Sequence, residues 1–356
     1  MDEVSITQQV AGLFEAMERF VPKWNIELPP WEEVQALAGN LGPSGLLILF
    51  TAASFLMVWR LDAIERNGFE GTIIGTLVMP FCSGFANLSF VFVMVSDKGG
   101  GNLVVENCIV NNVTNLTLVI GIQVVFWGLN ITGNRERSKK NPESTINHIS
   151  LLLSLGAMLF FTLTVWLLAR DGILDSSDGM VLTGLFLFWQ AFHVVDVIKN
   201  NVRKNRTVSP GVAVDFILVG LCAWVTFYTI DGLVEWVATR DASRFISVKN
   251  LGLLSGFLMV VPNALLAFYY SAKGRPDIAY SSQIGDCHIC IPLCIGISAI
   301  FSPIAIPPTF EMGASIIMGA GILLFICTAL LGRLPRIMGA GLALSYSIFL
   351  YRGILG

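Results

Sequence analysis

Hydrophobic residues in this chain are gathered into ten long runs that are separated by shorter polar stretches. A helix needs about 20 predominantly apolar residues to cross a bilayer, and each run approaches or exceeds that length. The pattern therefore predicts an all-α integral membrane protein with ten transmembrane helices, five in each half of the chain. The predicted spans are 43–60, 69–96, 103–132, 147–169, 178–199, 211–234, 250–272, 277–304, 312–332 and 335–353.

Polar residues interrupt the third and eighth spans, and the two interruptions match one another. KGGGNLVVENCIVNNVTNLTLVIGI begins at Lys98, and KGRPDIAYSSQIGDCHICIPLCIGI begins at Lys273. The two segments align without a gap over 25 positions, from a Lys-Gly start to an Ile-Gly-Ile end. An asparagine lies on the preceding span in each case, Asn87 in the first half and Asn263 in the second. A repeated polar stretch at membrane depth is typical of secondary transporters.

Composition and charge support this class and predict an orientation. The chain is 54% hydrophobic and 13% charged, whereas soluble domains are roughly 25% charged. Fourteen of the 22 Lys and Arg residues fall on one side of the spans, and the positive-inside rule makes that side cytoplasmic. Both termini then face outside, and the two five-helix repeats are inverted relative to each other. We expect a multi-pass protein of a plasma or bacterial inner membrane.

The same pattern predicts four parts of the chain. Residues 1–42 read as an amphipathic helix at the membrane interface, with a flexible tail as the alternative. Residues 43–199 form the first repeat, 200–210 a cytoplasmic linker and 211–356 the second repeat. The basic residues of the linker are expected in solvent, so no nucleic-acid partner is predicted.

The polar residues inside the spans suggest a site for a small inorganic cation. Asn111 and Asn115 lie four residues apart, hence on one helix face, and Asp286 and Cys290 are the equivalent pair. A carboxylate at mid-membrane costs about 2.5 to 3.5 kcal/mol, so Asp286 should have a cation or a proton as its partner. The expected site residues are Ser83, Asn87, Asn111, Asn115, Asn263, Asp286 and Cys290. The alternative is that the asparagines only bridge helices through hydrogen bonds.

Three further groups could contribute. Glu106 lies five residues before Asn111 and is a candidate gating or proton-accepting residue. His288 is either a hydrogen-bonded interior histidine or a pH-responsive group near Asp286. Cys287, Cys290 and Cys294 could bind a soft metal, although cysteine is also a common small core residue. No cofactor is expected, and no metal beyond the transported cation.

These segments resemble the cation/calcium exchanger superfamily, which includes the sodium/calcium exchangers. Each of that family's two inverted repeats carries GTSxPE on one helix and GNxxGSNxxNxLLVLG on the next. PNALLAFYYSAKGRPDIAYSSQIGDCHICIPLCIGIS follows this spacing, with KGRPDIA as the most specific piece, and CSGFANL and VENCIVNNVTNLTLVIG match the first repeat. The resemblance covers nearly all of the chain after residue 42. It implies alternating access, with a cation crossing in exchange for sodium or protons.

The departures from the family pattern bear on the ion. The two ion-binding glutamates of the family fall on Asn87 and Asn263, and the serine of GSN falls on Asn111 and Asp286. One carboxylate remains where the family uses two or more. Affinity for Ca²⁺ grows with the number of charged ligands, so a monovalent cation or a proton at Asp286 fits the charge better. Among Na⁺, H⁺, K⁺ and Ca²⁺, the sequence favours the singly charged ions.

Two other classes of function remain to be weighed. The chain could be a structural or sensing membrane protein on a degenerate exchanger scaffold, but apolar residues would then be more stable at the site positions. An intramembrane enzyme is not expected, since the sequence has no HExxH, paired aspartates or Ser/Lys dyad. The sequence therefore favours a secondary active cation antiporter.

Overall fold

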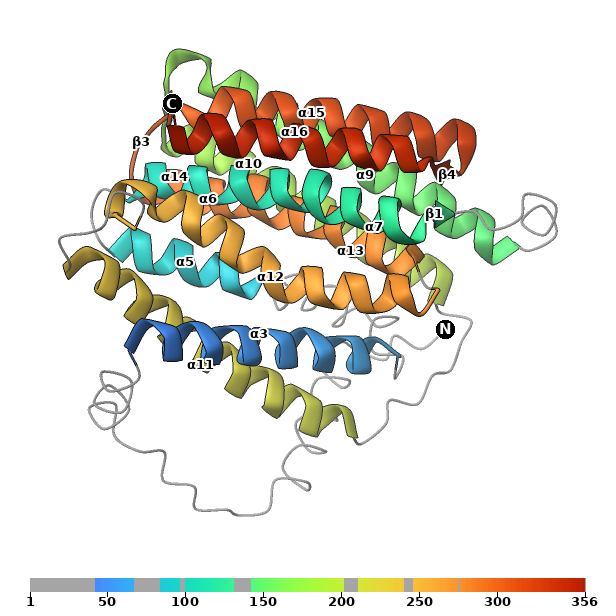
Figure 1. Ribbon diagram of the computed structural model, residues 1–356, viewed down its shortest axis with the longest axis horizontal. Helices are drawn as coiled ribbons and strands as arrows, with labels where there is room; N and C mark the ends of the chain where they lie inside the picture. Colours follow the sequence, from blue (N-terminus) through green and yellow to red (C-terminus); the bar gives the residue numbers. More distant parts are fainter. Residues whose placement is uncertain are drawn as a thin grey trace, which may run out of the picture.

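The computed structural model describes residues 42–66, 84–96, 100–130, 142–201, 211–239, 246–274 and 276–355. Ser83 and the predicted amphipathic helix before residue 42 lie outside these ranges. Long helices dominate the described residues, and most of them run roughly along the long axis of the molecule (Figure 1). This arrangement is what a bilayer requires, because every backbone polar group must be satisfied within the protein.

Helical segments lie at all ten predicted positions. The first half contains α3 (Gly42–Arg66), α5 (Phe85–Ser96), α6 (Gly101–Val113), η1 (Thr114–Val119), α7 (Ile120–Trp127), α9 (Pro142–Leu168), η2 (Ala169–Asp171) and α10 (Ser176–Asn201). The second half contains α11 (Gly211–Thr239), η3 (Val248–Asn250), α12 (Leu251–Ala272), α13 (Pro276–Ile289), η4 (Cys290–Ile295), α14 (Gly296–Phe301), α15 (Thr309–Ile326), η5 (Cys327–Leu331) and α16 (Arg336–Leu355). When consecutive helical segments are joined, the described ranges contain seven helices that are long and apolar enough to cross a membrane. The prediction of a helical membrane fold is confirmed.

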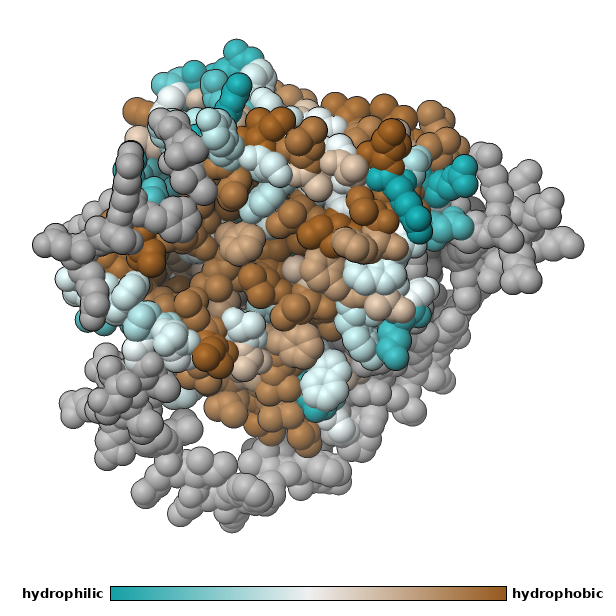
Figure 2. Space-filling model, viewed as in Figure 1, coloured by the Kyte–Doolittle hydropathy of each residue, from teal (hydrophilic) through white to brown (hydrophobic). Residues whose placement is uncertain are grey.

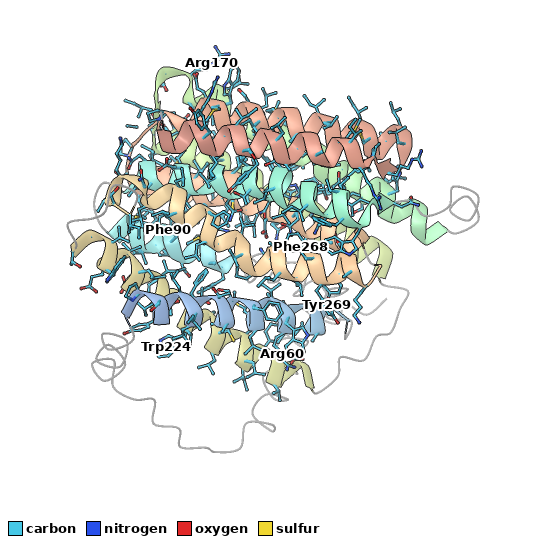
Figure 3. All side chains as sticks on the ribbon, viewed as in Figure 1. Arg60, Phe90, Arg170, Trp224, Phe268 and Tyr269 are labelled. Carbon is cyan, nitrogen blue, oxygen red and sulfur yellow. The ribbon has the colours of Figure 1, made fainter. Side chains whose placement is uncertain are left out.

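The two repeats interleave into one bundle. Helix α6 packs against α12, α7 against α16, α10 against α14 and α9 against α15, so each of these pairs joins one half of the chain to the other. Helices α3 and α11 pack on each other at one edge of the bundle and contact it through α5 and α12 (Figure 1). Arg60 of α3 pairs with Asp215 of α11 at 3.4 Å, and Figure 3 places Arg60 between these helices. The core therefore lies between the repeats.

Two short antiparallel sheets also join the repeats at equivalent places. Strand β1 (Leu129–Asn130) follows α7 and pairs with β4 (Arg333–Leu334), while β3 (Ile304–Ala305) follows α14 and pairs with β2 (Ile173–Leu174). The predicted spans 103–132 and 277–304 end a few residues too late, since their helices stop at Trp127 and Phe301 to form these strands. Gly128, with φ of +65°, makes the first of these stops.

Two pairs of glycines allow helices of opposite repeats to approach closely. An ideal Cβ on Gly121 of α7 would lie 2.9 Å from the carbonyl oxygen of Gly339 on α16. Its counterpart on Gly179 of α10 would lie 2.6 Å from the carbonyl oxygen of Gly296 on α14. Small residues have this role at helix contacts in membranes. Gly121 and Gly296 are the glycines of the two Ile-Gly-Ile endings, which explains why both copies carry one.

The outer surface is apolar over most of its length. Hydrophobic residues cover the middle of the face in Figure 2, and the hydrophilic residues gather toward its edges. Large apolar side chains are exposed, including Phe188 at 71% and Ile337 at 81%. Arg170 lies at the rim of the molecule in Figure 3 and stacks on Trp166, 3.8 Å from the ring centroid. Apolar sides with Trp and Arg at an end are the expected surface of a protein in a bilayer.

Candidate ion site

Five of the predicted site residues form one hydrogen-bonded network inside the bundle. Asn111 Nδ2 donates to Asn87 Oδ1 at 3.2 Å, and Asn115 Nδ2 donates to Asn111 Oδ1 at 3.0 Å. Asn115 Nδ2 also donates to Asp286 Oδ2 at 3.3 Å, and Asn263 Nδ2 donates to the same carboxylate oxygen. One connected set of amide and carboxylate groups thus comes from five helical segments, α5, α6, η1, α12 and α13.

The network repeats the symmetry of the sequence. Asn87 and Asn111 in the first half occupy the same aligned positions as Asn263 and Asp286 in the second, and each pair is in direct contact. The direction of the hydrogen bond differs, because Asn111 donates to Asn87 whereas an ionised Asp286 can only accept. Two equivalent half-sites therefore meet, one neutral and one carrying the carboxylate.

Asp286 is buried, so the charge of its carboxylate has the largest effect on the energy of the network. The residue is 4% exposed, and Asn111 and Asn115 beside it are fully buried. In the described part of the chain, no Lys or Arg pairs with Asp286, since the single ion pair there joins Arg60 to Asp215. A buried carboxylate without a positive partner is costly. Neutral amide donors are its direct partners here.

One buried oxygen beside the carboxylate has no partner. Asn115 uses its Nδ2 for both of its hydrogen bonds, and its Oδ1 accepts none. Amide and carboxylate oxygens are the ligands that hard cations prefer. Asn115 Oδ1 and the Asp286 carboxylate together provide hard ligands in the centre of the bundle.

A π segment interrupts each of the two long helices of the repeated sequence, with η1 between α6 and α7 and η4 between α13 and α14. Asn115 lies in η1 and Cys290 begins η4, and π segments inside α-helices are frequent at functional sites. In η1, the Thr114 hydroxyl donates to the carbonyl of Val110 at 2.7 Å and so competes with the backbone ladder. In η4, Pro292 has no backbone N–H to donate. Hydrophobic periodicity does not indicate these segments, and Thr114 and Pro292 are the sequence features that could have suggested them.

Cys290 contacts the network, but the other cysteines do not build a metal centre. Cys290 Sγ lies 3.6 Å from Asn111 Oδ1, and Cys108 reaches the thiols of Cys290 and Cys294. Cys287 instead donates to the carbonyl of Gln283 on its own helix. Within the described residues, no group of three or more His, Cys, Asp and Glu side chains is placed to hold a metal ion. The structure thus gives no support to the soft-metal alternative.

His288 points away from Asp286. The two residues are two positions apart, which puts them on opposite faces of α13. His288 Nε2 lies 2.9 Å from the carbonyl oxygen of Ser154 on α9. Its ring meets the edges of Phe161 and Trp189, with centroids 5.8 and 5.4 Å away. This geometry is that of an interior histidine that ties α13 to α9.

A polar contact outside the network was missed from the sequence. Asn107 Nδ2 donates to Ser255 Oγ at 2.8 Å and lies 3.4 Å from Met259 Sδ. Asn107 precedes Asn111 by four residues, so the same helical spacing that paired Asn111 with Asn115 would have found it. Glu106, next to it, is half-buried, and its Oε1 accepts a hydrogen bond from Thr309 Oγ1 at 3.4 Å. Glu106 does not touch the network.

Comparison with known proteins decides the family. The model of the family described as sodium/calcium exchanger protein matches residues 44–195 and 212–355. The chain belongs to the sodium/calcium exchanger family. The two matched stretches lie on either side of the predicted linker 200–210 and include every described residue of the network.

Solved structures of an exchanger share this fold. The sodium-calcium exchanger NCX_Mj soaked with 10 mM Na⁺ and zero Ca²⁺ aligns with a TM-score of 0.59 at 18% identity, over 86% of this chain and 95% of that one. The same exchanger soaked with zero Na⁺ and Ca²⁺ aligns with a TM-score of 0.62 at 16% identity, over 87% and 98%. No curated protein sequence matches this exchanger-family chain significantly. At these identities the structural likeness speaks for the fold.

Proposed function

We propose that this chain is a secondary active cation antiporter that works by alternating access and carries a monovalent cation or a proton at Asp286. Membership of the exchanger family supports cation exchange. The observation that carries the finer proposal is the single carboxylate of the network, which is buried among neutral asparagines. Na⁺, K⁺ and H⁺ are the candidate ions.

Charge balance favours a singly charged ion. A monovalent cation beside Asp286 makes the buried network neutral, whereas Ca²⁺ would leave one uncompensated positive charge. Calcium sites also draw their affinity from several charged ligands, and Asn87 and Asn263 add none. Exchange of calcium is therefore the less favoured activity of this site.

The amide groups explain how such a site can be both stable when empty and able to bind. Asn115 and Asn263 place N–H groups on Asp286 and so satisfy the carboxylate in the absence of a cation. An amide that rotates by half a turn presents its oxygen where its nitrogen was. The same asparagines can then act as donors to Asp286 or as oxygen ligands of a cation bound there.

The symmetry of the network fits alternating access. Asp286 is held by Asn115 of the first repeat and by Asn263 of the second. Transporters with inverted repeats expose a site at the repeat interface to each side in turn. A shift of one repeat against the other would therefore change the coordination of Asp286 directly.

A second candidate function is a structural membrane protein without transport. It is favoured by one observation, namely that Asp286 already has two amide donors and needs no ion to be satisfied. The buried carboxylate itself speaks against it, because a purely structural contact would be more stable with well-packed apolar residues in its place.

The test is ion flux in proteoliposomes containing the purified full-length chain. We expect uptake of Na⁺, K⁺ or H⁺ against a counter-gradient, and we expect Asp286→Asn to abolish it while Glu235→Gln, which removes an exposed acid of α11, leaves it intact. If the unaltered protein moved none of Na⁺, K⁺, H⁺ and Ca²⁺ under gradients of either direction, the antiporter would be rejected in favour of the structural role.

A further inference from the structure

Helices α6 and α12 carry side chains at matching four-residue spacing, most of them polar, in rows that extend beyond the ion site. Asn107, Asn111 and Asn115 recur every four residues along α6 and η1, and Ser255, Met259 and Asn263 do so along α12. The rows meet at Asn107, whose Nδ2 donates to Ser255 Oγ at 2.8 Å. Four residues of α-helix span about 6 Å, so this contact lies about one turn from Asn111.

Close helix packing holds this outer part of the rows together. Gly252 and Gly256 of α12 form a GxxxG pattern, which permits close approach of membrane helices. An ideal Cβ at Gly256 would lie 2.7 Å from the carbonyl oxygen of Asn107. At Gly252 it would lie 2.6 Å from Glu106 Oε2. The absence of a side chain at Gly252 leaves room for the Glu106 carboxylate against α12.

Glu106 is a second carboxylate within a membrane span, and it is half-buried. Thr309 Oγ1 at the start of α15 donates to its Oε1. The exposed Lys249 attracts it electrostatically, yet the two form no ion pair within the described residues. Ionisable residues inside spans are costly and mark ion pathways. Because Lys249 makes no ion pair with it, neutralising the Glu106 carboxylate within the span takes a bound cation or a proton.

We propose that Glu106, with the side chains of Asn107, Ser255 and Thr309, forms an access subsite for the transported cation. The subsite lies at the ends where α6 and α12 begin, about one helical turn from the network around Asp286. It loads the cation from that membrane face, and Asn107, four residues before Asn111, is its member nearest the network along α6. This inference rests on the proposed cation transport at Asp286.

The subsite also accounts for a departure from the family pattern. The hydroxyl positions before the second family glutamate are occupied here by Met259 and Val260, which offer no side-chain oxygen. Ser255 supplies a hydroxyl one turn earlier on α12, and Glu106 supplies the carboxylate that Asn263 lacks. Compared with the family pattern, the carboxylate and the hydroxyl thus lie nearer to the membrane face where α6 and α12 begin.

The experiment compares cation uptake from each face of proteoliposomes with known protein orientation. For Glu106→Gln we expect the half-saturating cation concentration to rise about tenfold at the Glu106 face, because a tenfold loss of affinity corresponds to the loss of one charged contact. At the opposite face the same concentration should change less than about twofold. Lys249→Gln should lower that concentration at the same face, because it removes a competing positive charge. Glu311→Gln, an exposed acid two residues from Thr309, is the matched control and should have no effect.

The outcomes separate this inference from the proposed function. An equal effect of Glu106→Gln at both faces, or none, overturns the access subsite while leaving transport at Asp286 in place. If the unaltered chain transports nothing, thermal unfolding of the intact protein in detergent is compared with and without Na⁺ and K⁺. The subsite then requires that Glu106→Gln weaken the stabilisation by cations, and an unchanged stabilisation overturns it.

Discussion

Asn115 of the first repeat donates a hydrogen bond from Nδ2 to Asp286 Oδ2 of the second repeat, at 3.3 Å. The bond joins residues 171 positions apart and closes the network between the two halves of the chain. Because Asn115 also holds Asn111, the position of the carboxylate is coupled to both half-sites. The candidate ion site therefore lies at the interface between the repeats.

Replacing Asn115 with Ala should weaken cation binding without unfolding the protein. The change removes one donor to Asp286 and the unpartnered Oδ1. Hydrogen bonds to charged groups contribute about 1.5 to 3 kcal/mol, so the half-saturating cation concentration should rise about tenfold to a hundredfold. Concentration-dependent uptake measures it, with Asn130→Ala at an exposed position as control. An unaltered value would show that Asn115 does not act on the cation.

A second carboxylate at Asn263 should shift the preference toward calcium. Asn263→Glu places an acid beside Asp286, which Asn263 already contacts. Divalent affinity rises with ligand charge, and we expect Ca²⁺ to bind at least about tenfold more tightly than to the unaltered chain. Ca²⁺-dependent thermal stabilisation and Ca²⁺ uptake provide the readouts. The neutral Asn263→Gln should bring no such gain, and a gain of equal size there would refute the role of charge.

Adding a methyl group at Gly121 should destabilise the contact between α7 and α16. The new Cβ would lie within 2.9 Å of the Gly339 carbonyl oxygen, closer than packing allows. Overpacking costs about 1 to 3 kcal/mol, so Gly121→Ala should lower the unfolding temperature in detergent. Gly220→Ala is the control, because a Cβ there meets nothing within 4 Å and alanine favours a helix. Equal unfolding temperatures for the two variants would contradict the close contact.

The Arg60–Asp215 pair should couple α3 to α11. Its atoms lie 3.4 Å apart, and the Asp215 side chain is 11% exposed. We expect a coupling energy of about 1 kcal/mol from a double-mutant cycle of Arg60→Gln and Asp215→Asn, measured by unfolding in detergent. Additive effects of the two changes would mean that the pair contributes nothing.

Much of the candidate site could be predicted from residue types and spacing. Asn111, Asn115 and Asp286 stood out because polar side chains are expensive in apolar spans, and the repeat indicated which positions correspond. Cys290 and the two asparagines at the glutamate positions followed from the same alignment. Those residues lie in one contact network in the structure.

Other contacts depended on which helices pack against each other. His288 is only two residues from Asp286, yet it turns to Ser154 of α9 because a helix sends such neighbours to opposite faces. The contact of Asn107 with Ser255 follows from the register of α6 against α12, which the glycines at 252 and 256 set. The π segments η1 and η4 further rotate the residues that follow them, so an ideal helical wheel misplaces those side chains.

The sequence by itself determined the membrane class, the ten helical positions and the twofold repeat, because the bilayer demands long apolar helices and penalises every polar exception. Only the tertiary structure decided which of the polar residues within the spans contact one another. It brings Asn87, Asn111, Asn115, Asn263 and Asp286 together and leaves Asn115 Oδ1 without a partner. The physical reason is that insertion depends on the hydropathy of each segment alone, whereas a site depends on how helices of opposite repeats are rotated and packed against each other.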